Sequence, residues 1–435
     1  MDPAHWPADY RERLERAAPD ACAANASLRE VGATATAGLD RQDRPTRPRR
    51  TNPDDVNHGG IRMIGKTRRL VTGVGGAVVL AVTAALTTPA AALAAQDDHA
   101  ATQAVLDRYQ AQAGPGAAVH AGDDTAAWTL SSGTAKIGQN RPITSTEHFR
   151  IGSQTKTFTA AVVLQLVDEG RVVLDAPIGQ YLPGVFTGNY DGAVITVRQL
   201  LQHTSGMVRD IRDAAPNPDG SYALTELVRS AMDEPAQFAP GAGLGYSNVG
   251  FLVLGLLIER VTGRTVRDAI TERVITPLGL AHTSFPAPGT RALADPYLPG
   301  YVGGRLGPFF FWTEGTTNTE LTFWSTAGAM ASTLEDMAAF YGALLDGRVV
   351  SPAALAEMRR TVAPDHSYGL ALSKVNLTCG GEAWGHNGAL PNGHYSITLT
   401  TDDGRFASLV TNGNVVSSRL VSVEVLDAAL CEVAA

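Results

Sequence analysis

Residues 153–167 read SQTKTFTAAVVLQLV and place a hydroxyl and an amine in front of a long apolar run. Lys156 is one of only four lysines in a chain whose other basic side chains are all arginine. Unlike a guanidinium, a lysine ammonium can lose its proton when burial or neighbouring cations lower its pKa. Because three positions separate the two residues, a helix would place them on one face, one turn apart. The segment predicts a nucleophile, Ser153, beside a possible base, Lys156.

The flanks of this segment predict that a helix begins there. Residues 149–152 (FRIG) favour an extended entry, and residues 168–170 (DEG) end the apolar run at a glycine. Ser153 would lie in the first turn, where free N–H groups and the helix dipole favour negative charge on its oxygen. Taken alone, an S-x-x-K pattern fits a capping serine and a surface lysine even better.

The first 94 residues have the composition of an extension and an export signal. Residues 1–62 lack sustained periodicity, so we expect either disorder or a misplaced start. Residues 63–94 contain a basic segment, an apolar segment and a small-x-small cleavage site, which predict a signal peptide. A cytoplasmic tail before a membrane anchor is the alternative, but Thr-Thr-Pro at 87–89 disfavours a stable span. We expect a secreted or cell-envelope protein, with no membrane span after cleavage.

Charge and cysteine content bear on three questions: nucleic-acid binding, a disulfide and a metal site. The chain has a formal net charge of −8 at pH 7, which disfavours nucleic-acid binding. Beyond the signal segment two cysteines remain, Cys379 and Cys431. In an oxidising compartment they suggest a disulfide worth roughly 4 kcal/mol, with two free thiols as the alternative. No second Cys or His accompanies either at ligand spacing, so we expect no metal site.

Residues 95–435 show strand patterns near both ends and helix patterns between them. Strands are predicted at 117–121, 126–131, 368–372, 383–384, 394–400 and 405–411. Helices are predicted at 101–113, 153–167, 197–202, 224–232, 248–262, 332–345 and 420–431. We expect an α/β domain of the α+β type, in which both ends build a mostly antiparallel sheet flanked by helices. An all-helical insertion would occupy about 170–325.

Two further motifs carry candidate site residues. In extended backbone Tyr246 and Asn248 point the same way, and a phenol near an ammonium could carry a proton to a leaving group. In His386-Asn387-Gly388 the glycine would let a substrate backbone approach a strand edge, with His386 as a hydrogen-bond donor. Taken alone, each motif fits a structural role about as well or better.

The order S-x-x-K, Y-x-N and H-x-G resembles the serine-type D-Ala-D-Ala carboxypeptidase and class C β-lactamase family. The resemblance covers about residues 100–433 and includes landmarks at 149–153, 174–177, 201–206 and 240–241. It implies a β-lactamase/transpeptidase-like fold and a monomeric serine hydrolase without a cofactor. The substrates would be D-Ala-D-Ala peptides, and β-lactams would acylate the serine. A β-lactamase, an esterase and a non-catalytic penicillin-binding protein are the alternatives.

The resemblance also implies roles for individual residues. Ser153 would be acylated, Lys156 would be its base and Tyr246 would carry the proton. Asn248 would hold the substrate amide, and His386 would orient the substrate, with Asn387 and Gly388 in contact with it. The N–H groups of Ser153 and Ala389 would form the oxyanion hole. Trp324 would form an aromatic wall of the cleft.

Two similarities and two departures relate this chain to the secreted D,D-peptidases of that family. The third motif, H-x-G, and the pairing of Cys379 with Cys431 are similar to that subgroup. Asn387 departs from it, because the middle residue of the motif is often a hydroxyl amino acid. A second departure lies at Ser373 and Lys374, where those enzymes tend to place an arginine for the terminal carboxylate of the substrate.

Overall fold

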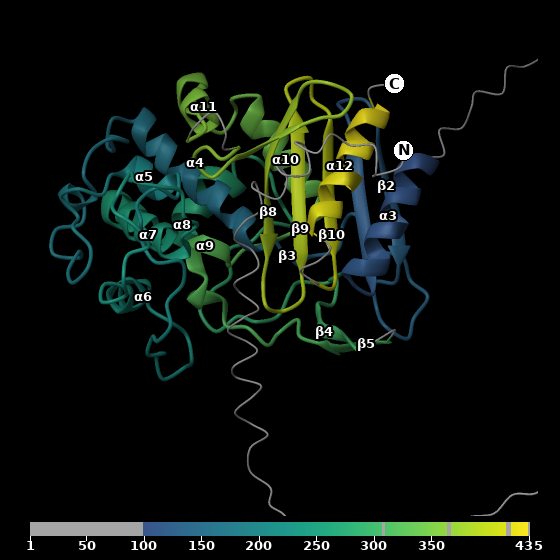
Figure 1. Ribbon diagram of the computed structural model, residues 1–435, viewed down its shortest axis with the longest axis horizontal. Helices are drawn as coiled ribbons and strands as arrows, with labels where there is room; N and C mark the ends of the chain where they lie inside the picture. Colours follow the sequence, from purple (N-terminus) through teal and green to yellow (C-terminus); the bar gives the residue numbers. More distant parts are fainter. Residues whose placement is uncertain (1–98, 307–308, 363–366, 415–418, 434–435) are drawn as a thin grey trace, which may run out of the picture. The chain divides into compact units, whose positions relative to one another are not determined.

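The computed structural model describes residues 99–306, 309–362, 367–414 and 419–433. The predicted N-terminal extension and signal peptide lie outside these residues. The main sheet has six antiparallel strands in the order β2-β1-β10-β9-β8-β7 (Figure 1). The strands are β1 (Gly116–Gly122), β2 (Ala127–Gly133), β7 (Ser373–Asn376), β8 (Glu382–Ala389), β9 (Tyr395–Thr401) and β10 (Phe406–Thr411). Because β1 pairs with β10, both ends of the domain build the sheet, as predicted.

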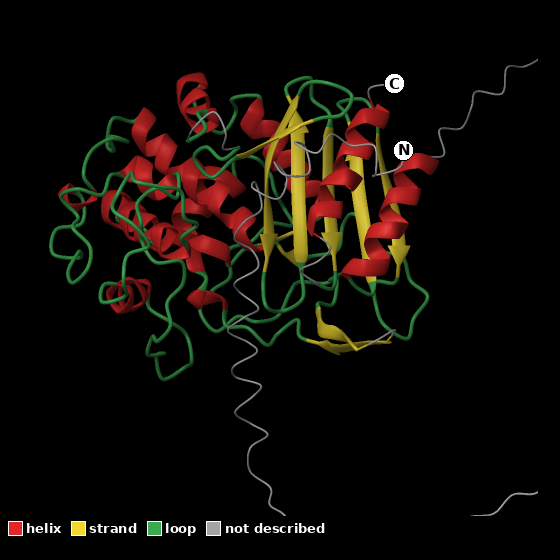
Figure 2. Ribbon diagram, in the orientation of Figure 1, coloured by secondary structure: helices red, strands yellow, loops and turns green. Residues whose placement is uncertain are grey.

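Helices cover both faces of this sheet (Figure 2). Helices α3 (Ala100–Ala113) and α12 (Arg419–Val433) pack on each other and against β1. Helix α10 (Leu334–Leu345) contacts β9 and β10 as part of the helical layer. Every residue of β9 is buried, which is the pattern expected of a strand covered on both sides.

A helical region lies beside the sheet and is built around two buried, apolar helices. Helix α4 (Thr155–Asp168) is buried over most of its length, and α7 (Asn248–Thr262) packs against it. Both are apolar around most of their circumference, which suits helices inside a protein. The surrounding elements are η4 (Ile178–Gln180), α5 (Val197–Leu201), α6 (Leu224–Ala231), α8 (Val266–Ile270), η5 (Thr271–Ile275) and α11 (Pro352–Arg359).

Short elements connect the sheet to the helical region. Strand β3 (Phe149–Arg150) pairs with β6 (Ala331–Ser332), and the 3-10 turn η3 (Gly152–Gln154) joins β3 to α4. Helix α9 (Ser325–Gly328) lies beside η3 and α4, and the turn η6 (Leu321–Phe323) contacts α9 and α6. These connections place the start of α4 against the end of β8.

Two sequence predictions about elements are wrong. The insertion is not all helical, because β4 (Tyr301–Leu306) and β5 (Phe309–Glu314) form a hairpin within it. Phe309 and Phe311 are exposed two residues apart, a strand periodicity that the helix-based interpretation missed. The strand predicted at 368–372 is displaced to β7, because Ala371 has a left-handed φ of 54° that interrupts extended backbone.

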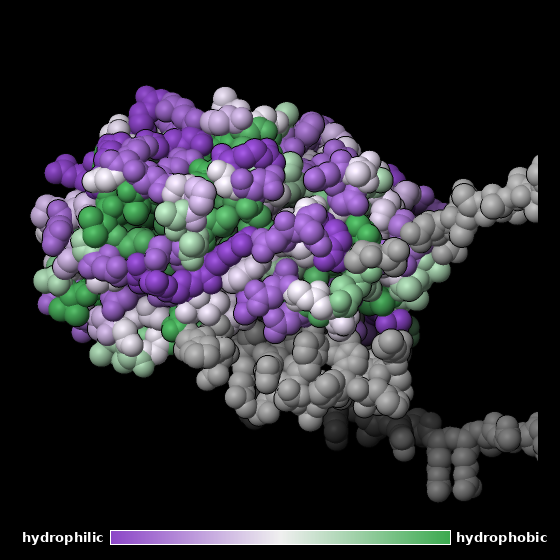
Figure 3. Space-filling model, turned by 90° about the horizontal axis from the view of Figure 1, so that it is seen from above, coloured by the Kyte–Doolittle hydropathy of each residue, from purple (hydrophilic) through white to green (hydrophobic). Residues whose placement is uncertain are grey.

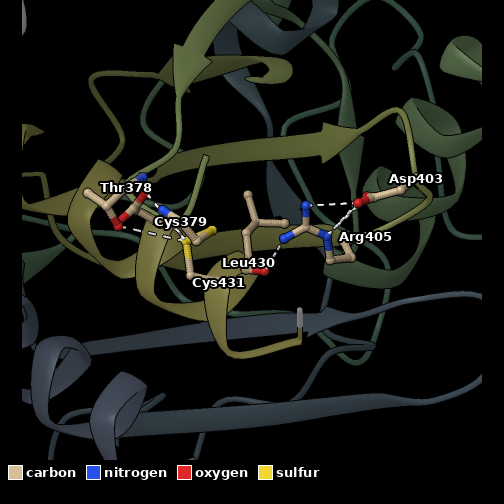
Figure 4. The surroundings of a disulfide bond; sticks show 7 residues. Thr378, Cys379, Asp403, Arg405, Leu430 and Cys431 are labelled. Carbon is tan, nitrogen blue, oxygen red and sulfur yellow. Dashed lines mark hydrogen bonds and ion pairs between the residues drawn. A yellow bond between two sulfur atoms is a disulfide. The ribbon is translucent and has the colours of Figure 1, made fainter. Parts of the chain in front are cut away.

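The disulfide between Cys379 and Cys431 joins the turn after β7 to the last turn of α12 (Figure 4). Thr378 adds two hydrogen bonds to the same helix, from its N–H and hydroxyl to the Asp427 carboxylate, at 2.8 and 2.5 Å. Arg405 donates to the Leu430 carbonyl at 2.7 Å. The C-terminal helix is therefore fastened to the sheet near its own end.

The face of the molecule seen in Figure 3 is mainly hydrophilic, with apolar side chains gathered in a few separate patches. Within the described ranges, no helix combines the length and the apolar character needed to cross a bilayer. The same residues contain no group of three or more His, Cys, Asp or Glu side chains placed to hold a metal ion.

Candidate active site

Ser153 lies in η3, two residues before α4 begins, so its position at the start of the predicted helix is confirmed. The serine is half-buried, whereas its neighbours Gly152 and Gln154 are buried. Gly152 has a left-handed φ of 53°, and a Cβ there would lie 2.6 Å from the backbone nitrogen of Ala389. Glycine is therefore required where the turn meets β8.

Lys156 is fully buried, and its amine has three oxygen neighbours. Its Nζ donates to the Asn248 Oδ1 and to the Ala327 carbonyl, both at 2.7 Å, and lies 3.1 Å from the Ser153 Oγ. A neutral amine has two N–H donors and one lone pair. The two carbonyl oxygens can only accept, so they take the donors and leave the lone pair for the serine hydroxyl.

The charge environment of Lys156 agrees with a neutral amine. Burial lowers the pKa of Lys156 well below its ordinary value of 10.5; the Asp210 carboxylate opposes that shift and the Arg209 guanidinium adds to it. Desolvation disfavours the ammonium because the charged form loses its hydration. The arrangement places an amine that is able to act as a general base at hydrogen-bond distance from Ser153.

Asp210 fixes the orientation of the Asn248 amide. Its Oδ1 accepts from the Asn248 Nδ2 at 2.5 Å, and the carboxylate has no donor of its own when ionised. The amide NH2 must therefore face Asp210, which leaves the Asn248 oxygen for Lys156. The Arg209 carbonyl also accepts the Asn248 N–H at 2.8 Å, so the loop at 209–210 is held along the start of α7.

Tyr246 lies over the same amine. The Lys156 Nζ is 4.7 Å from the centroid of the Tyr246 ring, and the Arg209 guanidinium carbon is 5.4 Å from it on the wall of the site. Tyr246 immediately precedes Ser247, which caps α7 by accepting the Gly250 N–H at 3.0 Å. The motif therefore both caps a core helix and contributes to the site.

The end of β8 approaches η3 closely. A Cβ at Gly388 would lie 1.8 Å from the Ile151 carbonyl oxygen and 2.9 Å from the Ser153 nitrogen. Glycine is therefore required where β8 meets the turn at 151–153, whereas the predicted approach of a substrate backbone to Gly388 stays a prediction. The backbone nitrogens of Ser153 and Ala389 both lie beside this contact, and their action as an oxyanion hole stays a prediction.

His386 directs both ring nitrogens to protein atoms. The Tyr368 hydroxyl lies 3.0 Å from its Nε2, and its Nδ1 lies 2.5 Å from the Asn387 carbonyl. A carbonyl can only accept, so Nδ1 carries the proton and Nε2 accepts from Tyr368. Burial lowers the pKa of His386 to about 3, which keeps the ring neutral. Its orienting action on substrate stays a prediction.

Asn387 and Trp324 are both half-buried at the margin of this region. Trp324 joins η6 to α9 and packs with a small apolar cluster of Leu321, Ala329 and Leu390. Leu390 directly follows β8, so the indole lies close to the end of that strand. The predicted substrate contacts of Asn387 and Trp324 remain predictions.

Sequence reasoning missed four contributors to the site: Arg209, Asp210, Tyr368 and the Ala327 carbonyl. Asp210 lies in a loop without a motif, and Tyr368 was assigned to a strand. A backbone carbonyl leaves no trace in side-chain patterns. Only the neighbouring landmark at 201–206 pointed to this part of the chain.

The chain matches the family model described as beta-lactamase over residues 101–430. It belongs to the beta-lactamase family. This finding confirms the resemblance inferred from the three motifs and identifies the chain as a serine hydrolase of that family, with the corresponding fold.

A curated relative and two solved structures illustrate the range of the family. Penicillin-binding protein 4 of Amycolatopsis lactamdurans is 29% identical over 341 residues, which are 74% of this chain and 87% of that protein. A D-stereospecific amidohydrolase from a Streptomyces species has a TM-score of 0.65 and 37% identity, covering 75% of this chain and 97% of its own. The D-amino acid amidase of Ochrobactrum anthropi SV3, in complex with L-phenylalanine amide, has a TM-score of 0.65 and 28% identity over 77% and 98% of the two chains.

Proposed function

We propose that this chain is an exported serine hydrolase that cleaves amides, short peptides or esters of D-configured amino acids through an acyl-enzyme on Ser153. The observation that carries the proposal is the buried Lys156 amine, 3.1 Å from the Ser153 Oγ, with its two donors directed to carbonyl oxygens. A nucleophile and a base in this arrangement are suited to acyl transfer.

The reaction proceeds in two stages. Lys156 takes the hydroxyl proton while the Ser153 oxygen bonds to the substrate carbonyl carbon, and the N–H groups of Ser153 and Ala389 stabilise the oxyanion. Tyr246 delivers a proton to the leaving nitrogen, the carbon–nitrogen bond breaks, and an acyl-serine remains. Water then attacks the ester with the same groups in reverse order, which releases the acid and regenerates the hydroxyl.

The choice between a D,D-carboxypeptidase and an amidase depends on the terminal carboxylate of the substrate. A carboxypeptidase needs a cation for that group. Lys374 already pairs with Glu382 at 2.8 Å, and Arg209 pairs with Asp210 at 3.2 Å. These pairings favour substrates without a free carboxylate, in line with the two amidohydrolases named above. D-Ala-D-Ala peptides remain the second candidate, supported by the likeness to penicillin-binding protein 4.

A substrate panel tests the proposal. Purified protein and Ser153→Ala are incubated with D- and L-alaninamide, D-Ala-D-Ala peptides, aryl esters and labelled penicillin. We expect the wild type to hydrolyse the D-amide faster than the L-amide and to retain penicillin on the peptide containing Ser153, with neither result for Ser153→Ala. No turnover of any substrate together with no adduct would overturn the proposal.

Glu382→Gln tests the carboxylate question directly. Removing the charge of Glu382 frees the Lys374 ammonium, so KM for a D-Ala-D-Ala peptide with a free C-terminus should fall several-fold. The same peptide with an amidated C-terminus provides the control, and its KM should stay unchanged. Equal effects on both peptides would show that Lys374 does not reach the leaving group.

Export has a separate test. N-terminal sequencing of protein collected from the culture medium is expected to begin shortly after Ala94, which would support cleavage of the predicted signal peptide. Retention of the complete chain in the cell would contradict it.

A further inference from the structure

His203 has two unfavourable features that the mechanism above does not explain. Its backbone has a left-handed φ of 60°, which is uncommon for any residue other than glycine. Its Nε2 is buried and has no hydrogen-bond partner among the residues that the structure describes. Strained backbone and unpaired buried polar atoms gather where function requires them. His203 also lies within the landmark at 201–206, to which no role has yet been assigned.

The landmark at 201–206 runs beside the loop that leads to Tyr246. Gly206 accepts the Gln237 N–H at 2.8 Å, and Thr204 accepts the Gly241 N–H at 2.8 Å through its backbone carbonyl. These bonds hold the loop along most of its length. Two further hydrogen bonds, both accepted by His203, hold the part of the loop that contains Tyr246.

His203 contacts three consecutive residues centred on Tyr246. Its carbonyl accepts the Gly245 N–H at 2.9 Å, and its Nδ1 accepts the Ser247 N–H at 3.1 Å. Between these bonds its ring packs against the Tyr246 ring, with centroids 4.2 Å apart. The left-handed backbone is thus the conformation in which both the carbonyl and the imidazole of His203 reach one segment.

The hydrogen bond from Ser247 also decides the tautomer of His203. Because Nδ1 accepts a backbone N–H, the ring proton must lie on Nε2. Burial lowers the pKa of His203 well below its ordinary value, and the Lys156 amine adds to that effect. A protonated ring would lose the bond to Ser247, so the neutral form is the one that supports Tyr246.

His203 is also linked to His386 of the H-x-G motif, through Tyr368. Its centroid lies 5.0 Å from that of the Tyr368 ring, and the Tyr368 hydroxyl donates to the His386 Nε2 at 3.0 Å. Burial raises the pKa of Tyr368 well above its ordinary value, so this layer holds no charge at neutral pH. Rigid neutral rings therefore connect Tyr246 with His386 behind the site.

We infer that His203 is a positioning residue that holds Tyr246 in place for proton delivery to the leaving group. The inference deepens the proposed function, on which it rests. It follows that loss of His203 should harm substrates whose leaving group needs a proton much more than substrates whose leaving group departs as a stable anion.

Two substrates with the same acyl group measure this difference. D-Alanine p-nitroanilide needs a proton on its leaving nitrogen, whereas D-alanine p-nitrophenyl ester releases a stable phenolate. The ratio of their kcat/KM values is taken on one enzyme sample, so a smaller folded fraction lowers both values equally and leaves the ratio unchanged. Wild type that cleaves neither substrate would refute the proposed function, which is a separate outcome.

The variants are chosen to preserve the backbone. His203→Asn keeps an acceptor near the Nδ1 position and tolerates a positive φ, but it removes the ring. We expect it to lower the anilide-to-ester ratio at least fivefold, and His203→Gly, the reserve variant, to lower it further. If His203→Asn and His203→Gly both lower the anilide-to-ester ratio less than fivefold, the inference is overturned.

Two comparisons distinguish a loss of Tyr246 positioning in His203→Asn from a general loosening of the core. His394 is another buried histidine whose Nδ1 accepts a backbone N–H, from Arg150 at 3.3 Å, so His394→Asn is the matched control and should leave the ratio unchanged. On a Tyr246→Phe background, His203→Asn should cause no further change in the ratio, because it acts through that tyrosine. An equal effect of His394→Asn, or additive effects of the two site substitutions, would contradict the assignment.

Discussion

The neutral form of Lys156, which burial favours, fits the hydrogen-bond capacity of its neighbours. Two carbonyl oxygens require two donors, and the hydroxyl of Ser153 can either donate or accept. An ammonium would also donate to the serine and so would not activate it. The neutral amine satisfies the same three neighbours and leaves its lone pair directed at the nucleophile. Burial therefore produces a base rather than a buried cation.

Lys156→Arg is the sharpest single substitution. It conserves charge, but guanidinium keeps its proton at any working pH and is bulkier than the ammonium that it would replace at a fully buried position. We expect acylation by penicillin to fall by at least about a thousandfold, close to the loss in Ser153→Ala. Single-turnover labelling measures it, and Lys136→Arg, an exposed lysine, should react normally. Acylation of Lys156→Arg near the wild-type rate would exclude Lys156 as the base.

Asp210 and Arg209 should shift the pH dependence of kcat/KM in opposite directions. Only the deprotonated amine acts as a base, so activity rises with pH through the pKa of Lys156. Asp210 raises that pKa and Arg209 lowers it. Asp210→Asn should move the rising limb to lower pH, and Arg209→Gln should move it to higher pH. Limbs that move together, or not at all, would show that another group controls the profile.

Asp210→Asn should also lower the plateau of activity, by about tenfold. An asparagine at this position can donate as well as accept, so the Asn248 amide is no longer held in one orientation. When Asn248 turns its NH2 toward Lys156, that donor competes with Ser153 for the lone pair. A single pH profile of kcat/KM for Asp210→Asn measures both the height of the plateau and the position of the rising limb.

At the scale of elements, the site depends on how closely β8 approaches η3. Gly388→Ala would place a methyl group 1.8 Å from the Ile151 carbonyl and push the two elements apart. We expect about a hundredfold loss of kcat/KM and a destabilisation of about 1 to 3 kcal/mol. Gly342→Ala in α10 is the control, because nothing lies within 4 Å of its added Cβ and alanine favours helix. Kinetics and denaturant unfolding of both variants check the expectation.

The success of the sequence predictions varied with the kind of element. Helices such as α4 and α7 were predicted because their apolar runs are long and end at glycine. The hairpin β4–β5 was missed because it lies in a region dominated by helix patterns. The predicted position of β7 is wrong because no sequence pattern indicates the left-handed φ of Ala371. Local patterns do not contain information about a single unusual φ.

The proposed catalytic residues are easier to find in the sequence than the residues that support them. Ser153, Lys156 and Tyr246 combine side-chain chemistry with short-range spacing, so a sequence pattern contains both. Asp210 and Tyr368 act through contacts between segments that are distant in sequence, and such contacts exist only after folding. The role of His203 belongs to the same class.

For the molecule as a whole, buried histidines that include His203, His386 and His394 should make the fold sensitive to acid. Burial lowers the pKa of His386 to about 3 and that of His394 to about 4. The unfolded chain binds these protons near pH 6.5, so stability is present above that value and is lost as pH falls toward the folded-state pKa values. At pH 4.5 each histidine should cost about 2 to 3 kcal/mol of the free energy of unfolding.

Urea unfolding at pH 7 and pH 4.5 measures this loss. His394→Gln, which removes one titrating ring and keeps a donor for the Leu298 carbonyl, should reduce the loss by about the share of one histidine. An unchanged pH dependence in this variant would show that other groups cause the acid sensitivity.

The pairing of β1 with β10 has a consequence for how the protein matures. The hydrogen bonds between these strands join residues nearly 300 positions apart, such as Ala117 and Thr411, so the sheet is dominated by contacts of high sequence separation. A chain emerging from a ribosome or a translocation pore cannot complete β-sheet assembly until its final strands are available. Antibiotic labelling of a nascent chain should therefore appear late and abruptly, as a report of completed synthesis.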